Sequence, residues 1–269
     1  MMRRTVCLLT ALCFLLCACG GKEDKAAQSF TLDQDTYNTL SAAVEGFNSQ
    51  DLRQTAVIIG LTQGDESRYF NQGTYAYSRK EPVAMSGKST EVYGGDGISV
   101  DVYYKAGAYY YSGKAGKFYE SFDKEQFLKQ YLCTNISLPA ENKVSGLRTA
   151  QTSAGTKYVL TAVDEDVFNA LFGDILLTYS GVKKPQRDKT KYTDGSFTCV
   201  LDGEGKLAAL SISCKVSLYD SPAYYPTGYV PTEAELCHSF ELSYELNVKA
   251  TGKDVEIESP TTKDFTFLG

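Results

Sequence analysis

The sequence predicts an α+β protein in which one antiparallel sheet packs against helices on one side. Runs of alternating polar and apolar residues recur along the chain, which is typical of half-buried strands. Glycine-rich breaks separate these runs, as in antiparallel hairpins. Three other segments have apolar residues at helical spacing behind a capping residue. The 269 residues include 20 Tyr and no Trp, and Tyr suits strands with one wet face.

The first structured segment is a predicted helix within residues 30–48. Leu40, Val44 and Phe47 fall at helical spacing, and Asp35 is the expected N-cap. Strand-like runs follow at 54–63, 69–78, 89–93, 98–105 and 108–112. Glycine-containing turns separate the last three runs, so we expect a meander of hairpins.

Two more helices are predicted in the middle of the chain. Asp123 and Gln126 resemble a capping box before an apolar helix face. Asp164 caps the next helix, with Glu165 and Asp166 in its first turn, where the helix dipole favours carboxylates. The apolar faces of the two helices are Phe127, Leu128, Tyr131 and Leu132 in the first, and Val167, Phe168, Leu171, Phe172 and Ile175 in the second. Two short strands within 143–162 lie between these helices.

The last third of the chain predicts a hairpin and one long strand. Strands 196–201 and 206–216 flank the turn at 202–205. With the tip at positions 203 and 204, Phe197 faces Leu210 and Cys199 faces Ala208. A long loop at 218–235 leads to a strand at 236–250, and 254–258 is a candidate final strand.

The N-terminus has the features of an export signal. Arg3 and Arg4 precede an apolar run that is too short to span a bilayer as a helix. Leu16, Ala18 and Cys19 then resemble the lipobox of bacterial lipoproteins. The resemblance implies cleavage before Cys19 and lipidation of its thiol. The expected organisation is a signal peptide at 1–18, a flexible tether at 19–29 and one domain at 30–269.

This resemblance also implies a location outside the cytoplasm, with the chain anchored to the cell membrane by lipidated Cys19. More than one acyl chain gives durable attachment. The net charge is −6 and becomes more negative when the signal removes Arg3 and Arg4. A nucleic-acid partner held by phosphate contacts is therefore disfavoured.

Four cysteines remain in the expected domain, namely Cys133, Cys199, Cys214 and Cys237. An exported compartment permits disulfides, and four cysteines allow three connectivities. The alternative is that they are buried free thiols, which are common. No C-x-x-C spacing occurs, so the sequence gives no support for a zinc ribbon or redox motif.

Catalytic and metal-binding patterns are scarce, and we expect a protein that is not an enzyme and has no cofactor or metal. His238 is the only histidine. Its neighbour Cys237 points to the opposite face of the predicted strand, so the two cannot form a dyad. A hydrolase that uses His238 with a distant nucleophile is the third and least favoured hypothesis.

The Tyr-rich middle of the chain resembles the LolA-like group of bacterial lipoprotein-related domains. The matching segments are 103–111, the run Lys117-Phe118-Tyr119 and the hairpin around Asp202-Gly203. The resemblance implies a single curved antiparallel β-sheet, an open half-barrel, packed on two or three helices. Some members hold acyl chains or lipidated proteins in the concave cavity, and others contact envelope partners.

The first functional hypothesis is non-enzymatic binding of a hydrophobic ligand or lipid on the concave face of the sheet. The alternative is a cell-envelope protein-interaction or sensor module that uses the Tyr/Pro-rich loop 219–231. In that case Tyr224, Tyr225 and Tyr229 are the candidate partner-binding residues, because Pro stiffens a loop and Tyr offers contact area at low entropy cost. Otherwise these rings fold back and close one end of the core.

Overall fold

The computed structural model describes residues 28–30, 32–93, 95–130, 135–182 and 185–268. Their strands form one 13-stranded sheet in the order β1-β8-β9-β10-β11-β12-β2-β3-β4-β5-β6-β7-β13. The strands are β1 (Gln28–Phe30), β2 (Leu52–Gln63), β3 (Glu66–Ser78), β4 (Ala84–Tyr93), β5 (Asp96–Lys105), β6 (Ala108–Gly113), β7 (Gly116–Ser121), β8 (Val144–Thr152), β9 (Gly155–Ala162), β10 (Lys191–Leu201), β11 (Leu207–Tyr219), β12 (Cys237–Thr251) and β13 (Thr266–Phe267).

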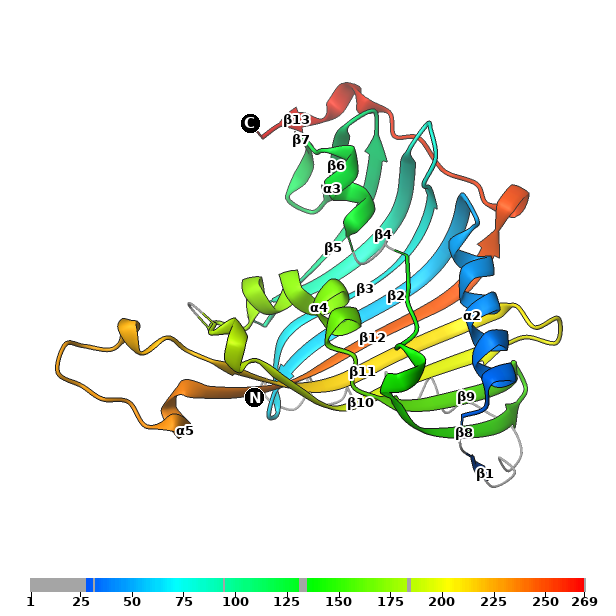
Figure 1. Ribbon diagram of the computed structural model, residues 1–269. Coiled ribbons are helices and arrows are strands. Elements are labelled where there is room, and N and C mark those ends of the chain that lie inside the picture. Colours follow the sequence, from blue (N-terminus) through cyan, green and yellow to red (C-terminus); the bar gives the residue numbers. More distant parts are fainter. Residues whose placement is uncertain (1–27, 31, 94, 131–134, 183–184, 269) are drawn as a thin grey trace, which may run out of the picture.

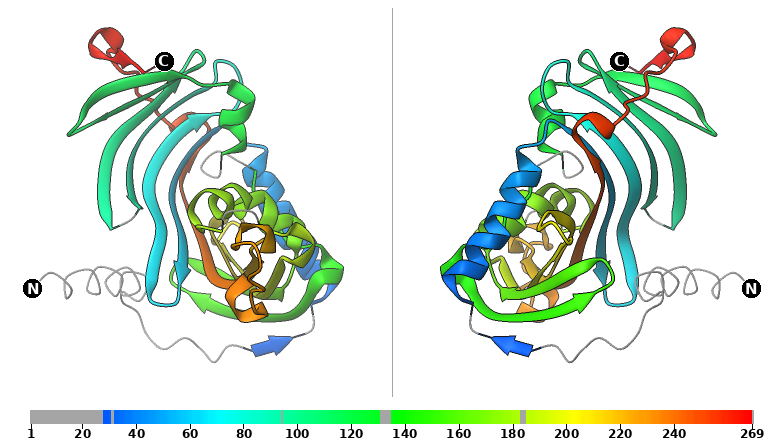
Figure 2. Two further views of the ribbon diagram at one scale, coloured as in Figure 1. Left: turned by 90° about the vertical axis from the view of Figure 1, so that its left-hand side faces the viewer. Right: turned by 90° about the vertical axis from the view of Figure 1, so that its right-hand side faces the viewer.

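The sheet is open and curves around helices (Figures 1 and 2). Helices α2 (Gln34–Asn48), α3 (Lys124–Lys129) and α4 (Glu165–Tyr179) lie on its inner side. A short fourth helix, α5 (Glu233–Leu236), lies beyond the end of the sheet. The predicted α+β class, with one curved sheet packed on helices, is confirmed. The sheet is not purely antiparallel, because β13 pairs with β7 in parallel.

Aspartates start the three inner helices, as predicted, but one of them was assigned to the wrong residue. Asp33, not Asp35, caps α2, and its Oδ1 accepts the Thr36 backbone N–H at 2.7 Å. Asp35 lies in the first helical turn instead, where its charge also favours the helix dipole. Asp123 caps α3 and Asp164 caps α4, both as predicted.

The hairpin between β10 and β11 has a different register from the predicted one. Phe197 faces Ile212 and Cys199 faces Leu210, because the turn is centred on Glu204 and a register irregularity after Val200 adds one more residue on the β11 side. The shift in pairing is two residues, so the same side chains still point inward. Phe197, Cys199, Leu210, Ile212 and Cys214 are all buried, as expected.

Two other expectations about strands were wrong. Residues 254–258 form no strand, since a 3-10 turn at Gly252–Asp254 redirects the chain. The short strands β1, β7 and β13 were missed. Strands β1 and β13 form the two ends of the sheet, so terminal segments pair with edges that otherwise expose unpaired backbone groups.

The inner side of the sheet is densely packed where α2 and α4 cover it. Leu40, Val44 and Phe47 of α2 join Phe168 and Phe172 of α4 in the buried core. Residues 135–143, which lead into β8, hold the C-terminal end of α2 in place. There the Asn48 amide donates to the Ile136 carbonyl at 2.7 Å and accepts the Ile136 N–H at 3.1 Å. The helices α2 and α4 and this segment therefore fill the inner side of one half of the sheet.

Candidate functional site

The other half of the sheet borders a partly open cavity of about 470 Å³, with β3–β7 on one side and α3 and α4 on the other. Its apolar walls are built by Ile98, Val100, Val102, Phe122, Leu171 and Ile175. Five tyrosines also line it, namely Tyr69, Tyr75, Tyr109, Tyr111 and Tyr179. This volume lies within the range of small-molecule sites. The concave face is therefore densely packed in one half and contains a cavity in the other.

The ring of Tyr75 forms the floor of the cavity. It lies flat on two glycines, which leaves the space above the ring open. Gly73 precedes Tyr75 by two residues on β3, and Gly87 is its cross-strand partner on β4. A Cβ at Gly87 would come within 2.7 Å of Tyr75 Cδ1, and one at Gly73 would clash with Oη and Cζ of Tyr75. With any larger residue at these positions the ring has to rise into the cavity.

Polar groups surround the Tyr75 hydroxyl on this floor. That hydroxyl lies 3.1 Å from Asn71 Oδ1 and 3.1 Å from Ser89 Oγ. The Asn71 amide donates to Ser89 Oγ at 3.0 Å. Tyr75 and Asn71 are almost fully buried. The three side chains form a mutually hydrogen-bonded cluster on an otherwise apolar wall, which is how buried polar groups are tolerated.

Tyr179, the last residue of α4, closes one end of the cavity. Its ring stacks on Tyr69 of β3 with 4.1 Å between centroids, and its hydroxyl donates to Glu91 Oε1 of β4 at 3.0 Å. Burial, reinforced by the Glu91 charge, raises the pKa of Tyr179 to about 12. The phenol is therefore a donor at neutral pH and holds α4 to the sheet.

The charged residues around the cavity are mostly acidic. In the described part of the chain, Glu91, Glu120 and Asp174 line it together with one cation, Lys129. Ile98 lies at the rim and is 64% exposed, which is unusual for a large apolar residue. The site therefore offers apolar walls, an exposed apolar entrance and an excess of carboxylates.

The Tyr/Pro-rich segment 219–231 extends away from the body beyond the ends of β11 and β12 (Figure 1). It does not fold back over the core. Tyr224 is 55% and Tyr229 49% exposed. Tyr225 has an internal role, since it stacks on Tyr229 and its hydroxyl donates to the Glu235 carbonyl at 3.0 Å. The Tyr229 hydroxyl donates to the Glu235 carboxylate. Only Tyr224 lacks such a contact within the described residues.

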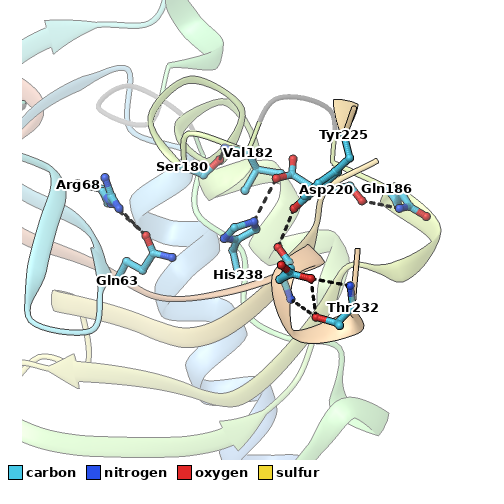
Figure 3. A network of polar contacts seen from close by, with 10 residues as sticks. Gln63, Arg68, Ser180, Val182, Gln186, Asp220, Tyr225, Thr232 and His238 are labelled. Carbon is cyan, nitrogen blue, oxygen red and sulfur yellow. Dashed lines mark hydrogen bonds and ion pairs between the residues drawn. The ribbon is translucent and has the colours of Figure 1, made fainter. Parts of the chain in front are cut away.

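His238 lies at the base of this segment, far along the chain from the cavity-lining residues. Its Nε2 is 3.1 Å from Asp220 Oδ2, and the Gln186 amide donates to the Asp220 carbonyl at 2.6 Å (Figure 3). The contacts join the two strand ends from which the segment leaves. Among the described residues, no group of three His, Cys, Asp or Glu side chains is arranged to hold a metal ion.

Cys199, Cys214 and Cys237 are free thiols, so no bridge joins any two of them. The register explains this, since Cys199 faces Leu210 and Cys214 faces Leu242 on the neighbouring strands. Burial raises the pKa of both Cys199 and Cys214 to about 12. These two behave as small apolar core residues, the alternative to the expected disulfides.

Several predicted features lie outside the described residues, including the signal peptide at 1–18, the lipidation site Cys19 and Cys133. Of the tether 19–29, only Gln28 and Ser29 are described, and both belong to β1. Within the described part of the chain, no helix is long and apolar enough to cross a membrane.

The residues of the cavity floor were not predicted from the sequence. Asn71, Ser89 and Glu91 interrupt an apolar face at every second position, and Gly73 and Gly87 fall on that same face. Small and polar residues on the inward face of two adjacent strands were a signal available from the sequence. Tyr179 gave no comparable signal, because the ending of α4 beside β3 and β4 is a tertiary relationship.

No family model matches this chain, and no curated protein matches it. In structure it is similar to LprF from Mycobacterium bovis, with a TM-score of 0.43 and 10% identity, over 86% of this chain and 99% of that one. It is also similar to the dehydratase domain from the CurF module of curacin polyketide synthase, with a TM-score of 0.12 and 10% identity, over 86% and 96% of the two chains.

Proposed function

We propose that this chain is a membrane-anchored extracytoplasmic lipoprotein that binds a hydrophobic ligand, without catalysis, in the cavity between β3–β7 and helices α3 and α4. Cys19 supplies the anchor, and the domain holds the ligand outside the cytoplasm. The open sheet curved around helices is the architecture that the resemblance to the LolA-like group implies.

The cavity on the concave face of the sheet carries this proposal. Its walls combine Val100, Val102, Leu171 and Ile175 with tyrosine rings, and a volume of about 470 Å³ remains between them. Apolar walls with a few convergent polar groups are typical of small-molecule sites. The exposed Ile98 at the rim adds apolar surface at the entrance.

Lipid extraction from purified full-length protein tests the proposal. Val100 points into the cavity, so Val100→Trp fills part of it. Ser99→Trp places the same ring on the exposed opposite face of β5 and is the matched control. We expect a stoichiometric co-purified lipid in the wild type and in Ser99→Trp, and at least a fivefold loss in Val100→Trp. Equal amounts of lipid in all three proteins, or none in the wild type, contradict the proposal.

A second function is favoured by the projecting segment 219–231. Tyr224 and Val230 are 55% and 87% exposed on a segment that extends away from the core. Exposed aromatic and apolar side chains on a proline-stiffened loop suit recognition of an envelope protein. This function is compatible with the first, because the segment and the cavity involve different residues.

A further inference from the structure

Three polar side chains lie in register on the cavity face of β3 and β4. Asn71 of β3 faces Glu91 of β4 directly, and Ser89 follows two residues before Glu91 on the same face. All three line the cavity. Asn71 and Ser89 hydrogen-bond to each other and to Tyr75. Glu91 is the charged end of this polar row.

One oxygen of the Glu91 carboxylate is available to accept a hydrogen bond from a ligand. Among the described residues its one hydrogen bond is to the Tyr179 hydroxyl, through Oε1. The bond orients the carboxylate, and the stacking of Tyr179 on Tyr69 fixes the donor in turn. Oε2 then remains as a strong acceptor at the wall of a partly desolvated site. A ligand group with an N–H or O–H satisfies it.

Charge selects against an anionic ligand at the same place. Among the described residues, the three carboxylates Glu91, Glu120 and Asp174 face one cation, Lys129, so negative charge is in excess. A carboxylate or phosphate head group would meet like charges without a matching donor set, which disfavours its binding. A hydroxyl or an ammonium group meets an acceptor instead.

From this arrangement we propose that the cavity selects amphiphiles whose head group donates hydrogen bonds and carries no negative charge, with Glu91 Oε2 as the acceptor. The inference rests on the proposed function and names its ligand class. The apolar tail lies between Val100 and Val102 of β5 and Leu171 and Ile175 of α4. Hydroxylated and ammonium head groups share this chemistry, and the test separates them.

The experiment is a competition on full-length protein held on an affinity resin and washed free of detergent. An equimolar mixture of hexadecanol, hexadecylamine and palmitate is applied at neutral pH, and mass spectrometry quantifies the bound ligands. We expect hexadecanol and hexadecylamine each to exceed palmitate by about tenfold. The Gln side chain still accepts a hydrogen bond but carries no charge, so Glu91→Gln should lower the amine-to-palmitate ratio about tenfold. It should change the alcohol-to-palmitate ratio less.

Asp101→Asn is the matched control, because Asp101 lies on the opposite face of β5 beside Lys88 and outside the cavity. Its binding ratios should equal those of the wild type. Palmitate bound as well as the other two ligands, or unchanged ratios in Glu91→Gln, overturns the selectivity while leaving the proposed function intact. Binding of none of the three by the wild type overturns both.

Discussion

The ring of Tyr75 lies over Gly87 of the neighbouring strand, so closely that a Cβ at position 87 would lie 2.7 Å from Tyr75 Cδ1 and 2.6 Å from the Thr74 carbonyl oxygen. The two residues are cross-strand partners. Their contact lets a large aromatic residue form the floor of the cavity without filling it.

Gly87→Ala should therefore reduce both stability and ligand capacity. The new methyl group forces Tyr75 and the local backbone apart, at a cost of about 1–3 kcal/mol. Chemical denaturation and lipid extraction measure the two effects. Gly46→Ala is the control, because a Cβ at Gly46 in α2 meets no atom within 4 Å. That control should be neutral or slightly stabilising, since Ala favours helix over Gly. Equal behaviour of the two variants contradicts the assigned role of Gly87.

We expect Tyr179 to make the folded protein less stable at alkaline pH. Burial and Glu91 raise its pKa from 10.0 to about 12 in the folded protein. The unfolded chain releases this proton first, so the contribution is complete below pH 10 and falls as the pH rises to about 12. Tyr179→Phe has no such titration.

Denaturation curves across this pH range measure the effect. The stability advantage of the wild type over Tyr179→Phe should shrink between pH 10 and about 12. The advantage over Leu177→Ala, on the exposed side of the same helix, should not follow that course. A constant difference between the wild type and Tyr179→Phe would show that the environment of the phenol does not favour its neutral form.

Arg53 should contribute more to stability than an ordinary arginine. It is fully buried where α2 ends and β2 begins, and it donates to the carbonyls of Asn48 and Gln50 and to the Asn135 side chain. Arg53→Met removes these donors from the helix C-terminus, and we expect a loss of about 2–4 kcal/mol. Exposed Arg148 on β8 provides the comparison. Arg148→Met should change the free energy of unfolding by less than about 0.5 kcal/mol.

The three described cysteines should differ in how readily a reagent reaches their thiols. Cys199 and Cys214 are buried, and their pKa values are raised to about 12, whereas Cys237 is only half-buried. Alkylation of the native protein followed by peptide mapping should modify Cys237 well before the other two. In denaturant without reductant all three should react. Protection of any of them under that condition would reveal a bridge.

The projecting segment should be dispensable for folding. Tyr224 and Val230 are largely exposed, so Tyr224→Ser combined with Val230→Ser should leave the melting temperature within about 2 °C of the wild type. The same protein should lose capture of an envelope partner in a crosslinking experiment. Unchanged capture would remove the second candidate function. A large fall in the melting temperature would instead assign these side chains a structural role.

Period-two and helical patterns in the sequence were enough to predict the class of fold and most strands and helices, because burial of one face dictates both periods. Phe197, Cys199, Leu210, Ile212 and Cys214 were correctly placed on one inner face even though their pairing was not. Pairing depends on the bulge near Val200, where no turn residue marks the irregularity. Asp123 and Asp164 were identified as helix caps from local sequence alone.

The site itself was decided by tertiary structure. Tyr179 and Glu91 are 88 positions apart, and their contact exists only because α4 crosses β3 and β4. The cavity depends on how much of the concave face the helices cover, and helix placement is set by packing between distant elements. The export signal expected at the N-terminus is a linear pattern, which can be predicted from the sequence by itself. Whether the inward-facing side chains of a strand contact a helix or line the cavity depends on the assembled structure.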